Sequence, residues 1–130
     1  RSNCVTGVQT CALPIYFNAP DGLSGNEDCG QMSAWYILNS MGFYQVCPGK
    51  PVYSIGRPLF EEVTINLPDR KTFVIRTHNN SKTNKYIESV LLNGKPLDVP
   101  FFTHDDLVRG GTMEITMSPV PTEWGKQVKN

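Results

Sequence analysis

The sequence predicts an α+β fragment in which one buried helix is followed by a mostly antiparallel, β-sandwich-like region. The only long apolar run, residues 31–41, has the pattern of a helix. After Gly42, short runs typical of strands alternate with turn-forming residues, which is the texture of an antiparallel sandwich. One of these turns is Asn93-Gly94, a strong short-range signal for a hairpin between two strands.

Residues 1–15 are left out of this fold prediction because they do not read as native sequence. Residues 5–15 resemble the translated read-through of a sequencing-library adapter, and the alternative is a genuine strand. Such a segment is excluded from fold reasoning. We therefore expect residues 1–15 to be a non-native scar, residues 16–49 to form a loop and a helix, residues 50–125 to form a β region, and residues 126–130 to be a tail.

Charge and hydropathy exclude several classes of partner. Twelve basic and twelve acidic residues give a formal net charge of zero. A nucleic-acid or anionic-membrane surface would need a basic excess, so we expect neither partner. No apolar run approaches the roughly 20 residues of a transmembrane helix, so we expect no membrane span.

Two cysteines, Cys29 and Cys47, remain outside the predicted scar. They either pair with each other or stay free and partly buried. The second alternative is favoured because a free cysteine behaves as a small hydrophobe. No Cys/His spacing of the metal-binding type is present.

Residues 31–41 form the predicted helix. Met32, Trp35 and Tyr36 fall on one broad face, and the flanking residues are also apolar, which predicts burial on most sides. Gly42 suits the left-handed position that ends a helix. Such a helix cannot bury its faces alone, so we expect its packing partners to lie in sequence missing from this chain.

The β region is predicted from local patterns. Residues 62–67 alternate with the period of two that a half-buried strand requires. A short helix is expected over residues 103–109, with Thr103 as its cap and Gly110 as its terminator. His78 and His104 are expected to be surface or capping residues. The predicted strands are residues 52–55, 61–67, 71–76, 86–92, 95–99 and 112–117.

The polar loop before the helix carries the candidate chemistry. Glu27 and Asp28 are adjacent carboxylates just before the helix N-terminus, where the helix dipole and free N–H groups favour the ionised acid. An ionised carboxylate can take a proton from water, as a general base does, and the alternative for Asp28 is a helix cap. The side chains of adjacent residues diverge, so Glu27 and Asp28 are not expected to form a catalytic acid–base pair with each other. One of them needs a catalytic partner elsewhere. Gly25 and Gly30 can adopt left-handed backbone angles.

The same residues resemble a known family. The block Gly-Asn-Glu-Asp-Cys-Gly-Gln-Met-Ser-Ala-Trp-Tyr at residues 25–36 is the most specific part. It is followed by Gly42-Phe-Tyr, by Tyr-Ser-Ile-Gly-Arg-Pro-Leu-Phe at residues 53–60, by Leu-Asn-Gly-Lys-Pro-Leu at residues 92–97 and by Trp124-Gly. Together they resemble the C-terminal part of glycoside hydrolase family 92, which comprises bacterial α-mannosidases.

The resemblance implies a parent enzyme with a β-sandwich domain and an (α/α)6 barrel. Residues 16–49 would be its active-site loop and last barrel helix. The parent would be an inverting, exo-acting, calcium-dependent α-mannosidase that hydrolyses terminal α-mannosides of glycans. It would be periplasmic, cell-surface or secreted, and we expect this fragment alone to be inactive.

The resemblance also assigns roles within the loop. Asp28 aligns with the family's general base. Asn26 stands where some members have a second acid, so it would only support catalysis through hydrogen bonds, or it is simply a turn former. Glu27 would contact the substrate directly, or it is either a solvated acid of the first helical turn or a residue that supports the site from behind. The general acid would lie upstream, in the missing N-terminal remainder of the chain, and no calcium ligand is assigned.

A rival interpretation is a non-catalytic carbohydrate-binding or structural β-sandwich module. A binding module would need an exposed aromatic platform on its sheet. Tyr53, Phe73 and Phe101 are the candidates for that platform, although each would also suit a core. On the helix, Trp35 and Tyr36 would either stack on a sugar or, as we expect, pack into a core.

Overall fold

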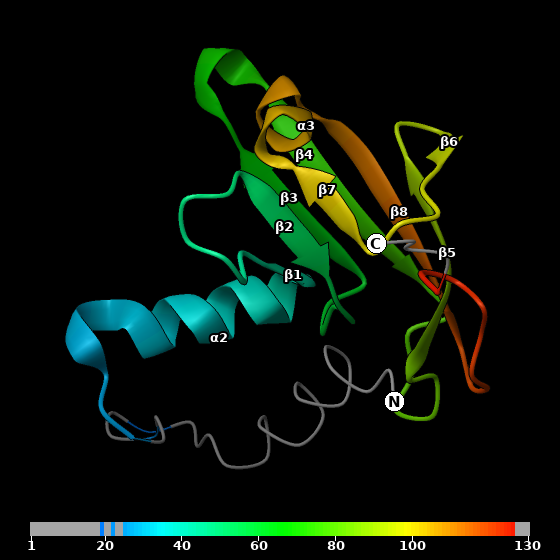
Figure 1. The fold of residues 1–130 in the computed structure, drawn as a ribbon, viewed down its shortest axis with the longest axis horizontal. Coiled ribbons are helices and arrows are strands. Elements are labelled where there is room, and N and C mark those ends of the chain that lie inside the picture. Colours follow the sequence, from blue (N-terminus) through cyan, green and yellow to red (C-terminus); the bar gives the residue numbers. More distant parts are fainter. Residues whose placement is uncertain (1–18, 20–21, 23–24, 127–130) are drawn as a thin grey trace.

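The computed structural model of the chain describes residues 19, 22 and 25–126. The predicted scar lies outside these residues, as do the last four residues of the predicted tail. The helix α2 stands beside two sheets, so the fold is α+β as the sequence predicts (Figure 1). In chain order the elements are η2 (Asp28–Gly30), α2 (Gln31–Met41), β1 (Phe43–Tyr44), β2 (Val52–Ile55), β3 (Glu62–Asn66), η3 (Pro68–Arg70), β4 (Thr72–His78), β5 (Tyr86–Leu92), β6 (Lys95–Pro96), β7 (Phe101–Thr103), α3 (His104–Arg109) and β8 (Gly111–Ser118).

Helix α2 has the predicted bounds and ends at Gly42. This glycine has φ 99°, and its N–H reaches the carbonyls of Leu38 and Asn39, which closes the last turn. A Cβ at this position would lie 2.5 Å from Cγ of Pro58. The carbonyl of Gly42 accepts a hydrogen bond from the Gly56 N–H at 2.8 Å. The C-terminal end of α2 is therefore fastened to the loop that follows β2.

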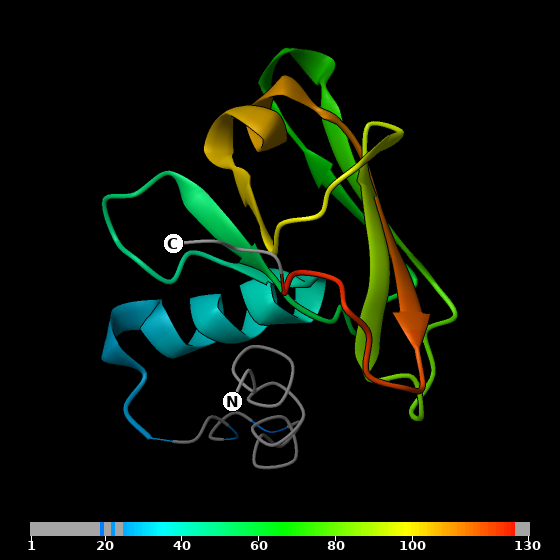
Figure 2. The same ribbon diagram turned by 45° about the vertical axis from the view of Figure 1, so that its right-hand side comes forward.

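The predicted burial of α2 on most sides is not seen among the described residues. Only Asn39 and Ser40 are buried within it, and the side chain of Ile37 is 56% exposed. In both ribbon views the helix extends away from the sheets and meets them only near its C-terminal end (Figures 1 and 2). The N-terminal half of the helix therefore lies away from the two sheets.

The smaller sheet is antiparallel and has the strand order β1-β2-β7. Strand β7 was not predicted as a strand, because its three residues are too few to show a period. Its Phe102 packs edge-on against Phe43 of β1, with ring centroids 5.6 Å apart. The sheet therefore joins the chain directly after α2 to residues almost sixty positions later.

The larger sheet has the order β3-β4-β8-β5-β6 and is mixed. Strands β4 and β8 run parallel, with Phe73 opposite Gly111, whereas the other neighbouring pairs are antiparallel. The region is thus mostly antiparallel, as predicted. The hairpin between β5 and β6 turns at Asn93 and Gly94, whose φ angles of 52° and 75° fit the predicted type of turn.

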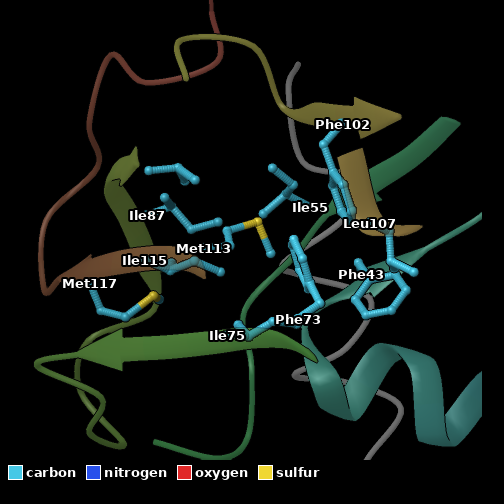
Figure 3. Packing of buried hydrophobic residues seen from close by; sticks show 11 residues of the cluster. Phe43, Ile55, Phe73, Ile75, Ile87, Phe102, Leu107, Met113, Ile115 and Met117 are labelled. Carbon is cyan, nitrogen blue, oxygen red and sulfur yellow. The ribbon is translucent and has the colours of Figure 1, made fainter. Parts of the chain in front are cut away.

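One core lies between the two sheets (Figure 3). Phe73 from the larger sheet and Phe102 from the smaller sheet stack with ring centroids 5.9 Å apart and an interplanar angle of 5°. This contact joins the sheets into the sandwich-like unit that the sequence predicts. The buried apolar residues of the cluster are Phe43, Ile55, Phe73, Ile75, Ile87, Val90, Phe102, Leu107, Met113, Ile115 and Met117.

The short helix α3 is capped as predicted. The Thr103 hydroxyl accepts a hydrogen bond from the Asp106 N–H at 3.2 Å and donates to the Asp106 carboxylate at 2.6 Å. The hydrogen bond from that hydroxyl lowers the pKa of Asp106 below its ordinary value. Leu107 inserts into the core, and Gly110 terminates the helix. No helix of the described residues is long and apolar enough to cross a membrane.

Candidate functional site

The loop before α2 has an unusual backbone. Glu27 has ordinary right-handed angles, and the next three residues all have positive φ: 48° at Asp28, 58° at Cys29 and 102° at Gly30. The glycine adopts this region freely, whereas each of the other two is disfavoured by about 1–2 kcal/mol. Strained conformations of this kind cluster at functional sites, where the surrounding structure holds them.

Glu27 caps helix α2. Its Oε1 accepts a hydrogen bond from the backbone N–H of Ser33 at 3.2 Å, and its backbone carbonyl accepts from the N–H groups of Gly30 and Met32. These bonds satisfy donors that an uncapped helix start would leave free. The capping role that the sequence offered as an alternative for Asp28 thus belongs to its neighbour Glu27.

Asp28 presents its side chain to solvent. Within the described part of the chain, its carboxylate makes no hydrogen bond or ion pair, and its backbone carbonyl accepts from the N–H of Gln31. Asn26, the other predicted site residue, is also exposed. The predicted site residues therefore lie together on one turn. Among residues 25–126 the carboxylate of Asp28 has no partner, whereas that of Glu27 accepts a bond from the Ser33 N–H.

The described residues do not form a calcium site by themselves. No three His, Cys, Asp or Glu side chains gather anywhere among residues 25–126 in a way that could hold a metal ion. Glu27 Oε2 is buried and has no partner in the same part of the chain, so it is a single unpaired oxygen. Calcium takes six to eight oxygen ligands. Most ligands of any such site would have to come from elsewhere.

The remaining predicted residues have structural surroundings. His78 lies 3.3 Å from the Glu114 carboxylate and His104 lies 2.9 Å from the Tyr53 hydroxyl; both histidines are exposed, as expected of surface residues. Trp35 and Tyr36 are half-buried and lie outside the main core cluster. Their expected place in a core is therefore not seen among the described residues.

The cysteines differ in part from expectation. Cys29 and Cys47 are free, as the favoured alternative has it, but both are exposed rather than partly buried. Cys29 belongs to the left-handed turn, and Cys47 lies in the loop after β1, where neither reaches the core.

The structure does not provide the aromatic platform of a binding module. Phe73 is fully buried in the core, and Tyr53 packs against Phe43 at a centroid distance of 5.3 Å. Phe101 remains partly exposed, at 37%, and it is the only one of the three candidates with that degree of exposure. The candidate aromatics thus mainly build the sandwich.

Arg57 has a contact that the sequence did not indicate. Its guanidinium donates to the carbonyl of Ser81 at 3.0 Å, while Asn80 donates to the carbonyls of Pro58 and Phe60. These bonds tie the loop after β2 to the connector between β4 and β5. Since the same loop anchors Gly42, they hold the C-terminal end of α2 against the β region.

The comparisons with known proteins concern this acidic turn, the helix that follows it and the β region behind them. Residues 3–119 match the model of the glycosyl hydrolase family 92 catalytic domain. The chain belongs to this family. The matched range begins inside residues 1–15, whose assignment as a scar stays a prediction.

Individual relatives agree with this assignment. The chain is 37% identical, over 117 residues, to an uncharacterized secreted glycosidase of Arthroderma benhamiae. The aligned residues make up 87% of the chain and 15% of that protein. The family GH92 α-mannosidase BT3965 of Bacteroides thetaiotaomicron, solved with mannoimidazole, is 40% identical over 91% of the chain, with a TM-score of 0.82. The inverting mannosidase BT2199 of the same organism is 43% identical over 88% of the chain, with a TM-score of 0.78. The chain spans 16% of each of these two structures.

Proposed function

We propose that this chain is the C-terminal part of an inverting, exo-acting α-mannosidase whose parent hydrolyses terminal α-mannosides of glycans. The observation that carries the proposal is the exposed carboxylate of Asp28, which has no partner among residues 25–126, on a left-handed turn directly before α2, in a chain of family 92. Two similar structures, one of an α-mannosidase and one of an inverting mannosidase, support the substrate class and the stereochemistry.

The proposed chemistry assigns Asp28 the role of general base. Its carboxylate takes a proton from a water molecule while the water oxygen bonds to the anomeric carbon and the glycosidic bond breaks. A carboxylic acid from the remainder of the parent gives a proton to the departing oxygen. Inversion requires these two carboxyl groups to stand about 6.5–9.5 Å apart, with room for the water.

The neighbouring carboxylate does not suit the role of that acid. Glu27 Oε1 is engaged by the Ser33 N–H, and its other oxygen is buried. A general acid must carry a proton and reach the leaving oxygen of the sugar. We therefore propose that the acid comes from the missing N-terminal remainder and that Asn26 assists only by hydrogen bonding to water or sugar.

Calcium dependence of the parent is a further part of the proposal and comes from the family resemblance. The ion would supply positive charge near the sugar, with most of its ligands outside residues 25–126. Removal of metal by a chelator should lower mannosidase activity, and added calcium should restore it. Activity that is unchanged after exhaustive chelation would remove calcium from the proposal.

Location also belongs to the proposal. The relative from Arthroderma benhamiae is named a secreted glycosidase, which supports a periplasmic, cell-surface or secreted parent. Fractionation of cells that express the full-length parent, followed by detection in periplasm, surface and medium, would test it. Detection in the cytoplasm alone would contradict it.

The direct test uses the full-length parent and an aryl α-mannoside. Asp28→Asn should lower kcat by about 10²–10⁴-fold, because the amide cannot take a proton from water. Asp69→Asn is the matched control, since Asp69 is also exposed with a left-handed φ of 59° but lies in η3. Wild-type kcat in Asp28→Asn would eliminate Asp28 as the base.

The isolated fragment should be inactive, and glycan binding by residues 43–130 alone would favour the rival binding module.

A further inference from the structure

The turn that carries Asp28 requires an external restraint. Asp28 and Cys29 both occupy the left-handed region, which neither residue type prefers, and an unrestrained loop would relax toward right-handed or extended angles. Relaxation would rotate the Asp28 carboxylate away from its position before α2. A catalytic group that moves by about 1 Å can lose about 100-fold in rate.

Glu27, which precedes this turn, accepts hydrogen bonds from backbone groups at the end of the turn and beyond it. Its carbonyl accepts from the N–H groups of Gly30 and Met32, at 3.2 and 3.3 Å, and its side chain reaches six residues ahead to the Ser33 N–H. Gly30 is the last left-handed residue, and Met32 and Ser33 follow it, so the single residue before Asp28 binds the backbone at the end of the turn and after it. These bonds close the left-handed segment into a loop. We call this set of hydrogen bonds to Glu27 the clasp.

The local geometry leaves room for this clasp. A Cβ built at Gly30 would have the Glu27 Oε1 as its nearest neighbour, at 4.0 Å, so the carboxylate lies over the glycine. The negative charge sits at the positive end of the α2 dipole, which favours this placement. Glu27 is the less exposed and Asp28 the more exposed of the two acids, so their side chains diverge.

We infer that Glu27 is a positioning residue, which fixes the left-handed turn through its bond to the Ser33 N–H and thereby aims the Asp28 carboxylate. The inference rests on the proposed function, because it concerns the same site. It differs from direct substrate binding by Glu27, which would require the carboxylate to face the sugar. The clasp needs a hydrogen-bond acceptor at Oε1 and does not need a negative charge there.

The experiment compares Glu27→Ala, Glu27→Gln, Glu27→Asp and Asp28→Asn in the full-length parent, with kcat, KM and the melting temperature measured for each. Glu27→Ala should lower kcat by about 10–100-fold with KM within about threefold of wild type. Glu27→Gln keeps an acceptor at the right reach and should retain kcat within about threefold. Glu27→Asp keeps the charge but is one methylene too short, so its kcat should fall like that of the alanine variant. Glu61→Ala, at an exposed acid before β3, is the matched control.

Each outcome decides the inference. Loss of kcat in the alanine and aspartate variants with rescue by glutamine supports it. Equal damage by glutamine and alanine, or a KM raised about tenfold or more by glutamine, would overturn it in favour of direct substrate contact. Normal kcat in Glu27→Ala, with only the melting temperature lowered, would reduce Glu27 to a structural cap. Should Glu27→Ala not fold, the aspartate and glutamine pair decides alone.

The two proposals fail in different ways. If Asp28→Asn retains full activity, the proposed base is wrong, whatever the Glu27 variants do. If Asp28→Asn is inactive and the Glu27 variants are all normal, only the positioning role is lost.

Discussion

The residues just before and just after α2 have left-handed backbone angles, and residue type predicts only some of them. The glycine type of Gly30 and Gly42 correctly predicted left-handed positions. Asp28 and Cys29 adopt the same region without being glycine, and a sequence pattern gives little sign of it. Residue type predicts low-energy angles, whereas strained angles depend on bonds such as that from Ser33 to Glu27.

Gly42 gives the sharpest prediction at this scale. Gly42→Ala should destabilise the chain by about 2–4 kcal/mol, because an L-residue is disfavoured at φ 99° and its Cβ would overlap Pro58. Gly49→Ala is the matched control, since Gly49 has φ 86° but no atom within 4 Å of the added Cβ. Chemical denaturation would measure both. Equal destabilisation by the two variants would contradict a role for the Pro58 contact.

Among the elements, those specified by neighbouring residues were predictable. Helix α2 and strands β2 and β5 have the predicted bounds, and the Thr103 cap of α3 follows from residue types at fixed spacing. The parallel pairing of β4 with β8 could not be predicted, because it joins segments more than thirty residues apart. Strand β7 was not predicted either, because its three residues are too few to show an alternating pattern.

The cap of α3 should make stability depend on pH. The folded-state pKa of Asp106 is lowered, mainly by the Thr103 hydroxyl, so its stabilisation is fully present above the unfolded value of about 3.9 and is lost as pH falls through the folded value. Thr103→Ala should cost about 0.5–2 kcal/mol at pH 7, and the difference from wild type should shrink in acid.

Denaturation of both proteins at pH 7 and at several values below 4 would measure this dependence. Asp105→Asn is the control, because Asp105 lies in the same first turn, whereas Thr103 bonds to Asp106 among the described residues. A difference between wild type and Thr103→Ala that stays constant down to strong acid would contradict the role of the Asp106 carboxylate.

For the whole molecule, the two sheets share a single core, so they should unfold together. Phe73→Ala should destabilise the chain by about 3–5 kcal/mol, because it removes a fully buried ring that stacks on Phe102 of the other sheet. Phe101, which is 37% exposed, is the matched control, and Phe101→Ala should cost less, about 1–2 kcal/mol. Calorimetry should show one transition in each variant, and separate melting of the sheets would contradict a shared core.

The candidate site was predictable as a location but not as an arrangement. Residue types placed Asn26, Glu27 and Asp28 before the helix, and the structure brings them onto one turn. Which carboxylate turns inward could not be read from two adjacent acids, because the choice depends on the backbone twist between them. The packing partners of the apolar faces of α2 and the proposed general acid are both predicted to lie in sequence outside this chain.

The order of strands in the larger sheet has a consequence for biosynthesis. Strand β8 lies between β4 and β5, although it is made after both. A nascent chain that has delivered only residues up to about 110 would leave two strand edges open at the centre of the sheet, where they can pair with other chains. The ribosome must release residues 111–118 before this gap closes, so completion of the sheet comes late and a chaperone that shields those edges would raise the yield of folded protein.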